Sequence, residues 1–242
     1  MNMPTDTNKK LALIGYGKMG RLIEQLSPQF GFDVVLRLDA PENEHGEGIT
    51  AGSFNGVDVA IEFSMPETAP VNLMRLAELR VPAVTGTTGW LNRLDEVRSV
   101  VEKRQSGLVW SPNFSTGVAV FRRLTALAAE LLRDETSYGA WAWEIHHDQK
   151  KDAPSGTLLH LVEAMKDAGY ARAIDVGSNR AGMHPGTHEI GFDSAADTIT
   201  LRHTARSREG FARGALKSAQ WIIGRTGVHT FEEVLFGEGG KS

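Results

Sequence analysis

The stretch Leu11-Ala-Leu-Ile-Gly-Tyr-Gly-Lys-Met-Gly20 decides the fold of this 242-residue chain. Its first four residues form a short continuous apolar run, which is typical of a strand buried in a parallel sheet. The run ends in Gly15-Tyr-Gly-Lys-Met-Gly20, which fits the pattern G-x-G-x-x-G, and apolar residues at helical spacing follow it. Strand, glycine turn and helix in this order predict a dinucleotide-binding unit.

Each glycine has a physical role in such a unit. Gly15 permits the tight turn, Gly17 lets backbone N–H groups approach a pyrophosphate, and Gly20 lets helix and strand pack closely. An acidic residue, Asp39, ends the next strand-like run at a spacing of about 20, where these units place the carboxylate that binds the adenosine ribose. We therefore expect a cofactor to contact Gly15, Tyr16, Gly17, Lys18, Met19, Gly20 and Asp39.

The same aspartate predicts the choice of cofactor. A carboxylate repels the 2′-phosphate of NADPH, and Ala40 stands where an NADP-selective protein would place arginine. We expect NADH, NADPH or both to serve, with NADH used at least as well. Lys18 and Arg37 could still soften that preference.

Strand-like and helix-like segments alternate up to about residue 114. Strands are predicted at 33–38, 57–63, 82–85 and 108–110, and helices at about 18–29, 66–79 (with Pro66 in the first turn) and 91–103. This rhythm means βαβ units and a parallel sheet. Beyond it we predict helices at about 118–132, 156–168 and 211–224, and strands at 140–146, 187–192 and 198–203. The last two strands lack an intervening helix, so an antiparallel or mixed sheet is expected there.

Composition excludes several classes of protein. The net charge of −4 gives no basic field for nucleic acid or an anionic membrane. No apolar run approaches the roughly 18 residues of a membrane span. The polar residues Met1–Lys10 lack a signal-peptide core and are expected to form a disordered lead-in. Because there are no cysteines, disulfides and thiolate chemistry are excluded. We expect a cytoplasmic protein with neither nucleic-acid nor membrane partners.

Two small-residue segments follow predicted strands at the edge where parallel sheets bind ligands. They are Phe63-Ser64 and Gly86-Thr-Thr-Gly89. Backbone groups there, including those of Thr87 and Thr88, would meet the nicotinamide end of a cofactor. An ordinary turn with a helix cap is the alternative for both segments.

The stretch Glu144-Ile-His-His-Asp-Gln-Lys-Lys-Asp-Ala-Pro-Ser-Gly-Thr157 carries the candidate substrate chemistry. Adjacent residues of a strand face opposite ways, so His146 shares a face with Ala142 and Glu144. His147 shares a face with Trp141, Trp143 and Ile145, which is expected to be the packing face. We therefore expect His146 to be the histidine exposed to substrate, as a general acid.

Cations and a helix start surround that histidine in the sequence. Lys150 supplies a proton donor and a fixed positive charge, whereas Lys151 is expected to be solvated. Ser155 is a natural N-cap, and Gly156 and Thr157 would offer first-turn N–H groups to a carboxylate. Capping without a ligand is the alternative use of this turn. No histidine pair has the spacing of a helical metal site, so we expect no metal.

These motifs together resemble 4-hydroxy-tetrahydrodipicolinate reductases over nearly the whole length of the chain. The resemblance is carried by Gly15–Gly20, Gly86–Gly89, Ser111-Pro-Asn-Phe-Ser115, Glu144–Thr157 and Arg206-Ser-Arg-Glu-Gly-Phe-Ala-Arg-Gly-Ala215. It implies an NAD(P)H-dependent reduction in the diaminopimelate route to lysine, acting on a small dicarboxylate. The block with two histidines, Lys150 and Asp-Ala-Pro-Ser-Gly-Thr is highly specific, whereas the first glycine motif is not.

The resemblance also implies residue roles and an architecture. His146 and Lys150 would be catalytic, while His147, Lys150, Ser155, Gly156 and Thr157 would hold the substrate carboxylates. The cofactor cleft would be lined by Pro112, Asn113 and Phe114, and Arg208 would reach the pyrophosphate when the domains close. The implied fold is α/β: a Rossmann-type dinucleotide-binding domain (1–114 and 209–242) with a parallel sheet, and an α+β substrate domain (115–208) with a mixed sheet. The second domain would build a homotetramer through its sheet.

Two other functions stay open at this point. One is another amino-acid-pathway dehydrogenase with two domains, related to homoserine or aspartate dehydrogenases. The Ser-Gly-Thr turn beside His-His-x-x-Lys argues against it. The other is a dinucleotide-sensing regulator without turnover, against which His146 and Lys150 argue. Whether the true substrate is the hydroxylated compound or its dehydrated form is also open.

Overall fold

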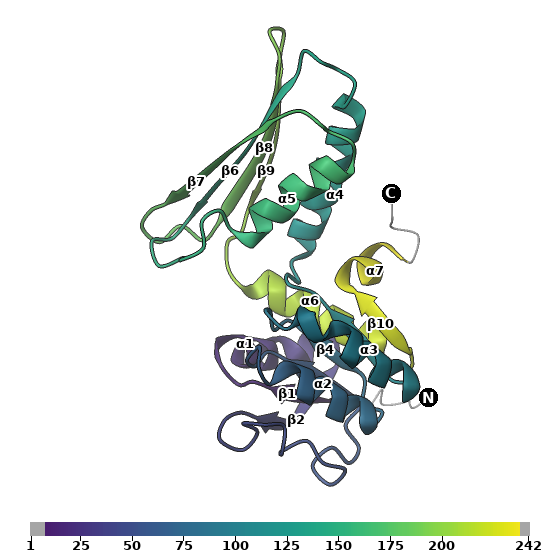
Figure 1. Cartoon of the computed structure of the whole chain (residues 1–242). Helices are drawn as coiled ribbons and strands as arrows, with labels where there is room; N and C mark the ends of the chain where they lie inside the picture. Colours follow the sequence, from purple (N-terminus) through teal and green to yellow (C-terminus); the bar gives the residue numbers. More distant parts are fainter. Residues whose placement is uncertain (1–7, 238–242) are drawn as a thin grey trace, which may run out of the picture. The chain divides into compact units, whose positions relative to one another are not determined.

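The computed structural model describes residues 8–237, which fold into two compact units (Figure 1). The first unit contains the chain up to Ser115 and again from Phe211 onward, and the second is Thr116–Gly210. Most of the expected lead-in, Met1–Lys10, lies outside the described residues. Its end does not fit that expectation, because Lys9 and Lys10 already belong to the first strand.

A six-stranded sheet forms the centre of the first unit. Its strands are β1 (Lys9–Ile14), β2 (Phe32–Leu38), β3 (Val59–Glu62), β4 (Ala83–Thr85), β5 (Gly107–Trp110) and β10 (Gly227–Thr230). Their order is β10-β5-β4-β3-β1-β2, and every pair is parallel. This confirms the predicted Rossmann-type sheet, and β10 adds an edge strand that the sequence did not predict.

Helices connect these strands, with starts and ends that differ in places from the predicted ones. They are α1 (Lys18–Leu26), η1 (Ser27–Phe30), α2 (Ala69–Glu78), η2 (Leu91–Arg93), α3 (Leu94–Lys103), α6 (Glu209–Ile222) and α7 (Phe231–Phe236). The prediction that Pro66 opens a helix is wrong, because Thr68 is the N-cap and Pro70 is the proline of the first turn. The first helix ends at Leu26 because Pro28 follows in a separate 3₁₀ turn.

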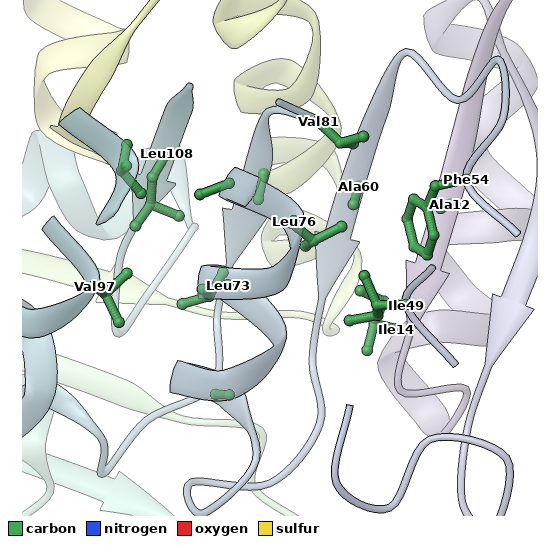
Figure 2. Packing of buried hydrophobic residues seen from close by; sticks show 14 of the residues in the cluster. Ala12, Ile14, Ile49, Phe54, Ala60, Leu73, Leu76, Val81, Val97 and Leu108 are labelled. Carbon is green, nitrogen blue, oxygen red and sulfur yellow. The ribbon is translucent and has the colours of Figure 1, made fainter. Parts of the chain in front are cut away.

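Alternate residues of the strands face opposite sides of the sheet. On one side, shown in Figure 2, Ala12 and Ile14 of β1 pack in one cluster with Leu73 and Leu76 of α2 and Val97 of α3. Each of these residues is at most 1% exposed. The apolar runs seen in the sequence therefore serve as the core that holds the ends of the strands in register.

The second unit has a four-stranded mixed sheet with two helices on one face (Figure 1). Its elements are α4 (Thr116–Leu132), β6 (Gly139–His146), α5 (Gly156–Asp167), β7 (Ile174–Arg180), β8 (Thr187–Asp193) and β9 (Thr198–Thr204). The order is β7-β6-β8-β9, in which β6 and β7 are parallel and the other pairs antiparallel. The predicted mixed sheet is confirmed, but β7 was missed because its sequence, Ile-Asp-Val-Gly-Ser-Asn-Arg, is mostly polar.

The expectation about the two faces of β6 is wrong. The helices cover the face that carries Ala142 and His146, which are 0% and 8% exposed, whereas the tryptophans lie on the half-buried opposite face. Size explains this choice, since Ala142 leaves room for α5. Trp141 instead lies over Gly191 of β8, where an added Cβ would come within 2.0 Å of the indole. Among the described residues no helix is long and apolar enough to cross a membrane.

Candidate active site

The glycine motif adopts the geometry that its residues suggest. Gly15 has a φ of +86°, and a Cβ there would meet the Phe63 carbonyl oxygen at 2.0 Å. A Cβ on Gly20 would lie 2.4 Å from the Gly15 carbonyl oxygen, so the helix can approach the turn only with glycine. Gly17 caps α1 without a side-chain hydrogen bond and has open space around it. This helix N-terminus can therefore accept the phosphates of a dinucleotide.

Two charged residues at the end of β2 have different surroundings. Asp39 is exposed, and within residues 8–237 its carboxylate accepts a single hydrogen bond, from the backbone N–H of Ala40 at 3.1 Å. Arg37 donates to the Glu24 carboxylate on α1 through its Nε at 3.0 Å and its guanidinium also lies over the Tyr16 ring. This contact lowers the pKa of Glu24. Arg37 is therefore engaged by a carboxylate, while Asp39 faces solvent.

The segments after β1, β3 and β4 meet at one edge of the sheet. Phe63 N donates to Ile14 O at 2.8 Å, and Gly86 N donates to Glu62 O at 3.1 Å. A Cβ on Gly86 would lie 2.1 Å from the Phe63 ring, which explains the glycine. The predicted pair of segments, Phe63-Ser64 and Gly86–Gly89, is therefore brought together.

A buried carboxyl group that the sequence did not single out joins those segments. Glu62 is 0% exposed and accepts hydrogen bonds from Ser64 N at 2.9 Å and from Thr87 Oγ1 at 3.1 Å, and also from the hydroxyls of Ser64 and Thr85. Burial raises the pKa of Glu62, although these hydrogen bonds oppose the rise. A lone acid at the end of the apolar run Val-Ala-Ile-Glu was the available signal.

The segment after β5 is divided between surface and core. Pro112 is exposed and Asn113 half-buried, with its Oδ1 accepting Ser115 N at 2.8 Å. Phe114 is only 1% exposed and packs against Phe63 and Phe231, with ring centroids 6.3 and 5.0 Å away. Its side chain is therefore packed in the core of the first unit.

The predicted carboxylate-binding turn begins α5. Ser155 is the N-cap, and its hydroxyl accepts Leu158 N at 3.2 Å. Because the cap satisfies the third helical N–H, those of Gly156 and Thr157 in the first turn point beyond it. The helix N-terminus also favours a negative charge.

A carboxylate of the chain itself already lies at this position. The Lys150 ammonium is bound to both oxygens of Asp152, at 2.8 and 3.0 Å. Hydrogen bonds from Lys150 and from the Gly156 backbone lower the pKa of Asp152. Two further predicted site residues, the half-buried His147 and the exposed Arg208, belong to the same unit as this turn.

Strand pairing places a second, buried group of polar residues next to the turn. In the register of the sheet Glu144 of β6 lies opposite His188 of β8 and Ser178 of β7. Glu144 is 0% exposed, and Arg180 Nη2 donates to its Oε1 at 2.9 Å. Burial opposes ionisation of Glu144, but hydrogen bonds from Ser155, Ser178 and Arg180 outweigh it and lower its pKa to about 2.

His146 belongs to this buried group. Its Nδ1 lies 3.5 Å from Glu144 Oε2, and its ring meets that of His188 edge to face at 5.0 Å. Burial lowers the pKa of His146, and it lowers that of His188 to about 4. The prediction that His146 is the exposed histidine is therefore wrong. Its ring lies next to Glu144, whose carboxylate also binds Ser155 of the turn. Sequence reasoning missed His188 because its partner comes from another strand.

Both halves of the chain match models of one protein family. Residues 9–114 match the N-terminal domain of dihydrodipicolinate reductase, and residues 117–235 match its C-terminal domain. The 4-hydroxy-tetrahydrodipicolinate reductase of Christiangramia forsetii is 35% identical over 236 residues, covering 93% of this chain and 97% of that protein. The enzyme of that name from Staphylococcus haemolyticus is 32% identical over 247 residues, covering 93% and 100%.

Solved structures show the same fold. The dipicolinate-bound dihydrodipicolinate reductase from Paenisporosarcina sp. TG-14 has a TM-score of 0.77 at 21% identity and covers 92% of this chain and 97% of that chain. An aspartate dehydrogenase from Thermotoga maritima has a TM-score of only 0.50 at 10% identity, with 89% and 97% covered. On the match of both domains and of full-length relatives, this chain belongs to the dihydrodipicolinate reductase family.

Proposed function

We propose that this protein reduces 4-hydroxy-tetrahydrodipicolinate to tetrahydrodipicolinate with NADH or NADPH, in the biosynthesis of diaminopimelate and lysine. The observation that carries the proposal is the turn at the start of α5, where Lys150 already binds a carboxylate of the chain itself, that of Asp152, and the Gly156 backbone helps to lower the pKa of this carboxylate. A substrate carboxylate has the same chemistry. Family membership supplies the reaction, and the two units supply a dinucleotide-binding fold and this anion site.

The first unit would bind the cofactor, whose dihydronicotinamide supplies a hydride when bound. Open space at Gly17 and the uncapped start of α1 support binding of the pyrophosphate between residues 15 and 20. Asp39 would accept hydrogen bonds from the ribose diol. Ser64 and Thr87, which Glu62 holds together, would position the nicotinamide. Pro112 and Asn113 would border it, and Arg208 of the second unit would contact the pyrophosphate.

We propose NADH as a cofactor used at least as well as NADPH. Asp39 carries the charge that repels a 2′-phosphate. The structure adds a second reason, since the guanidinium of Arg37 is already bound to Glu24 and stacked on Tyr16. A phosphate would have to compete with that carboxylate for the cation. Lys18 is the remaining exposed cation of the motif.

The second unit would bind the two substrate carboxylates. Lys150 and the first-turn N–H groups of Gly156 and Thr157 would hold one or both, with Ser155 fixing the turn and His147 assisting. Binding would displace Asp152 from Lys150. One carboxylate replaces another, so little electrostatic energy is lost in the exchange.

Two proton donors adjoin this anion site. His146 is buried beside Glu144, whereas Lys150 is partly exposed. The ring that accepts a hydride takes up a proton, and either residue could supply it. An anionic dicarboxylate beside His146 would favour its protonated form, so substrate binding itself would prepare the donor.

The domain roles and the assembly are further parts of the proposal. Residues 1–114 with 209–242 would form the cofactor domain, and 115–208 the substrate and oligomerisation domain. The half-buried sheet face with Trp141 and Trp143 supports a homotetramer built through that sheet.

The proposal is tested by mixing the purified protein with NADH and freshly generated substrate and recording the NADH absorbance. We expect turnover with this substrate, and no formation of NADH when aspartate or homoserine is instead mixed with the protein and NAD+. His146→Gln and Lys150→Ala should both lower turnover, while Lys151→Ala, a neighbouring solvated lysine, should not. Binding of NADH without turnover of any substrate would favour the dinucleotide-sensing regulator, and unchanged turnover in both variants would refute the residue roles.

A further inference from the structure

A single buried carboxylate, that of Glu144, connects the turn of α5 to the candidate proton donor. Its Oε1 accepts Ser155 N at 2.8 Å and Ser178 Oγ at 2.7 Å, and its Oε2 accepts the Ser155 hydroxyl. Ser155 in turn caps α5. The position of the first-turn N–H groups therefore depends on this carboxylate, from a strand outside the turn.

The same oxygen faces two histidines. Glu144 Oε2 lies 3.5 Å from His146 Nδ1 and 3.3 Å from His188 Nε2. Among the described residues His146 Nδ1 is buried without a hydrogen-bond partner within the usual limit, and Glu144 Oε2 lies 3.5 Å from it. His188 Nε2 also lies 3.3 Å from the Ser155 hydroxyl.

These three side chains also bring together atoms that a metal ion could use, within 4.8 Å of one another. The surroundings argue against that use. Arg180 donates to the same carboxylate at 2.9 Å, and a second cation beside a buried guanidinium is unfavourable. Ser155 occupies the remaining acceptor position on Oε2. A positioning role therefore fits the contacts better than a metal site.

Gly186 lies against the opposite edge of the His146 ring. A Cβ on Gly186 would lie 3.0 Å from His146 Nε2 and Cδ2, so any side chain there would press on that edge. Gly186 also has a φ of +124°, which other residues rarely adopt. One ring nitrogen of His146 thus lies 3.5 Å from a carboxylate oxygen, and the other lies next to a residue without a side chain.

We infer that Glu144 and His188 are positioning residues: Glu144 holds His146 with Nδ1–H toward the carboxylate and Nε2 as the proton-transferring nitrogen, while it fixes the carboxylate-binding turn. His188 packs edge to face on His146, and its Nε2 lies 3.3 Å from the same Glu144 Oε2. The meaning of this arrangement for catalysis rests on the proposed function, but the arrangement itself does not. His146 gives the substrate its proton from Nε2. The other proton stays on Nδ1 and faces the Glu144 carboxylate.

The charges around His146 determine how it titrates. The groups that act on its charge come from three strands and the following loop: Glu144, Lys150, Asp152, Arg180 and His188. Burial lowers the pKa of His146, and Lys150 and Arg180 lower it further, while Glu144 and Asp152 oppose them. Removing the charge of Glu144 therefore lowers the pKa of His146 again. With a pKa of about 4, His188 stays neutral near neutral pH.

Nitrogen-15 NMR of the histidine rings in the full-length, ligand-free protein tests the inference without turnover. His146→Gln and His188→Gln assign the signals. In the wild type we expect His146 to be the Nδ1–H tautomer. In Glu144→Gln, which keeps the shape and removes the charge, we expect proton density to move to Nε2 and the titration of His146 to move to lower pH. Glu189→Gln is the matched control, since Glu189 is a carboxylate of the same sheet paired with Arg202 at 3.2 Å.

Kinetics provides a second measurement. Glu144→Gln should lower kcat at least about tenfold, with the alkaline decline of kcat moved to lower pH, because a general acid must be protonated. Near-wild-type circular dichroism establishes folding. If Glu144→Gln does not fold, Glu144→Asp, which retains the charge, should keep the Nδ1–H tautomer.

An Nε2–H tautomer in the wild type, or in Glu144→Asp, would overturn the inference. So would a folded Glu144→Gln protein with an unchanged His146 titration. If the wild type fails to turn over the proposed substrate while the NMR results hold, the proposed function fails and the positioning role stands.

Discussion

Replacing Asp39 by alanine should shift the balance between the two cofactors toward NADPH. Asp39 directly follows β2, is exposed, and forms no salt bridge with any of the described residues. Its carboxylate would bind the ribose diol of NADH and repel the 2′-phosphate of NADPH. The variant removes the hydrogen bonds to NADH and the repulsion of NADPH at once. Their free energies therefore add in the ratio of kcat/KM for NADPH to kcat/KM for NADH.

The size of the shift follows from the exposure of the carboxylate. At about 4 Å in water two unit charges interact with about 1 kcal/mol, and a phosphate monoester carries about 1.5 to 2 charges, so NADPH gains about 1.5 to 2 kcal/mol. An exposed hydrogen bond to the ribose contributes about 1 kcal/mol to NADH binding. The sum of about 2.5 to 3 kcal/mol corresponds to about a hundredfold change in the ratio.

The assay is steady-state kinetics with each cofactor at a fixed substrate concentration and stated salt. Asp33→Ala is the matched control, because Asp33 is an exposed aspartate of β2, the strand that Asp39 follows. It should leave the ratio unchanged. A large preference of the wild type for NADPH would refute the reasoning, as would a ratio in Asp39→Ala within about threefold of the wild type.

The remaining predictions concern the substrate site and the nicotinamide segment. Lys150→Ala should lower kcat about a hundredfold and raise KM for the substrate, because a proton donor and a carboxylate-binding cation are lost together; unaltered steady-state parameters would contradict both roles. Acid should destabilise the fold in two steps, checked by urea unfolding at several pH values. Below pH 6.5 His188 becomes protonated in the unfolded chain, whereas in the folded protein its pKa of about 4 keeps it neutral. Stability therefore falls as the pH decreases from 6.5 to about 4. Between pH 4.5 and about 2 the Glu144 carboxylate becomes protonated in the unfolded chain but stays ionised in the folded protein, so stability falls further. His188→Gln should flatten only the first step, and a wild-type slope in that variant would count against the assignment. Gly86→Ala should raise KM for NADH and lower stability by about 1–3 kcal/mol, because the new Cβ would lie 2.1 Å from the Phe63 ring; unchanged thermal unfolding and KM would show that this contact is unimportant.

Much of the first unit could be predicted because its information is local. Parallel strands buried on both faces are continuous apolar runs. The turn at Gly15 requires glycine because a Cβ would clash with the Phe63 carbonyl oxygen, so the glycine is visible in the sequence. The strand β10, Gly-Val-His-Thr, has one apolar residue in four and pairs only with β5, so its sequence carries little signal. The polar strand β7 was missed for the same reason.

The candidate site was predictable only in part, since half of it depends on pairing between distant strands. Lys150, Ser155 and Gly156 lie within one stretch, and the sequence placed them together. The partners of Glu144 come from other strands at a register that no local pattern specifies. The face of β6 was predicted wrongly because tryptophans were taken as the packing side, whereas small residues allow a helix to approach.

The most direct test of the central claim is to follow the hydride itself. Incubating the protein with freshly generated substrate and NADH deuterated at the transferable position, and then analysing the product by mass spectrometry, identifies both product and transfer. The account predicts tetrahydrodipicolinate that carries one deuterium, formed in proportion to the NADH oxidised. Oxidation of NADH without deuterium in that product, or no reaction with an authentic substrate, would contradict it.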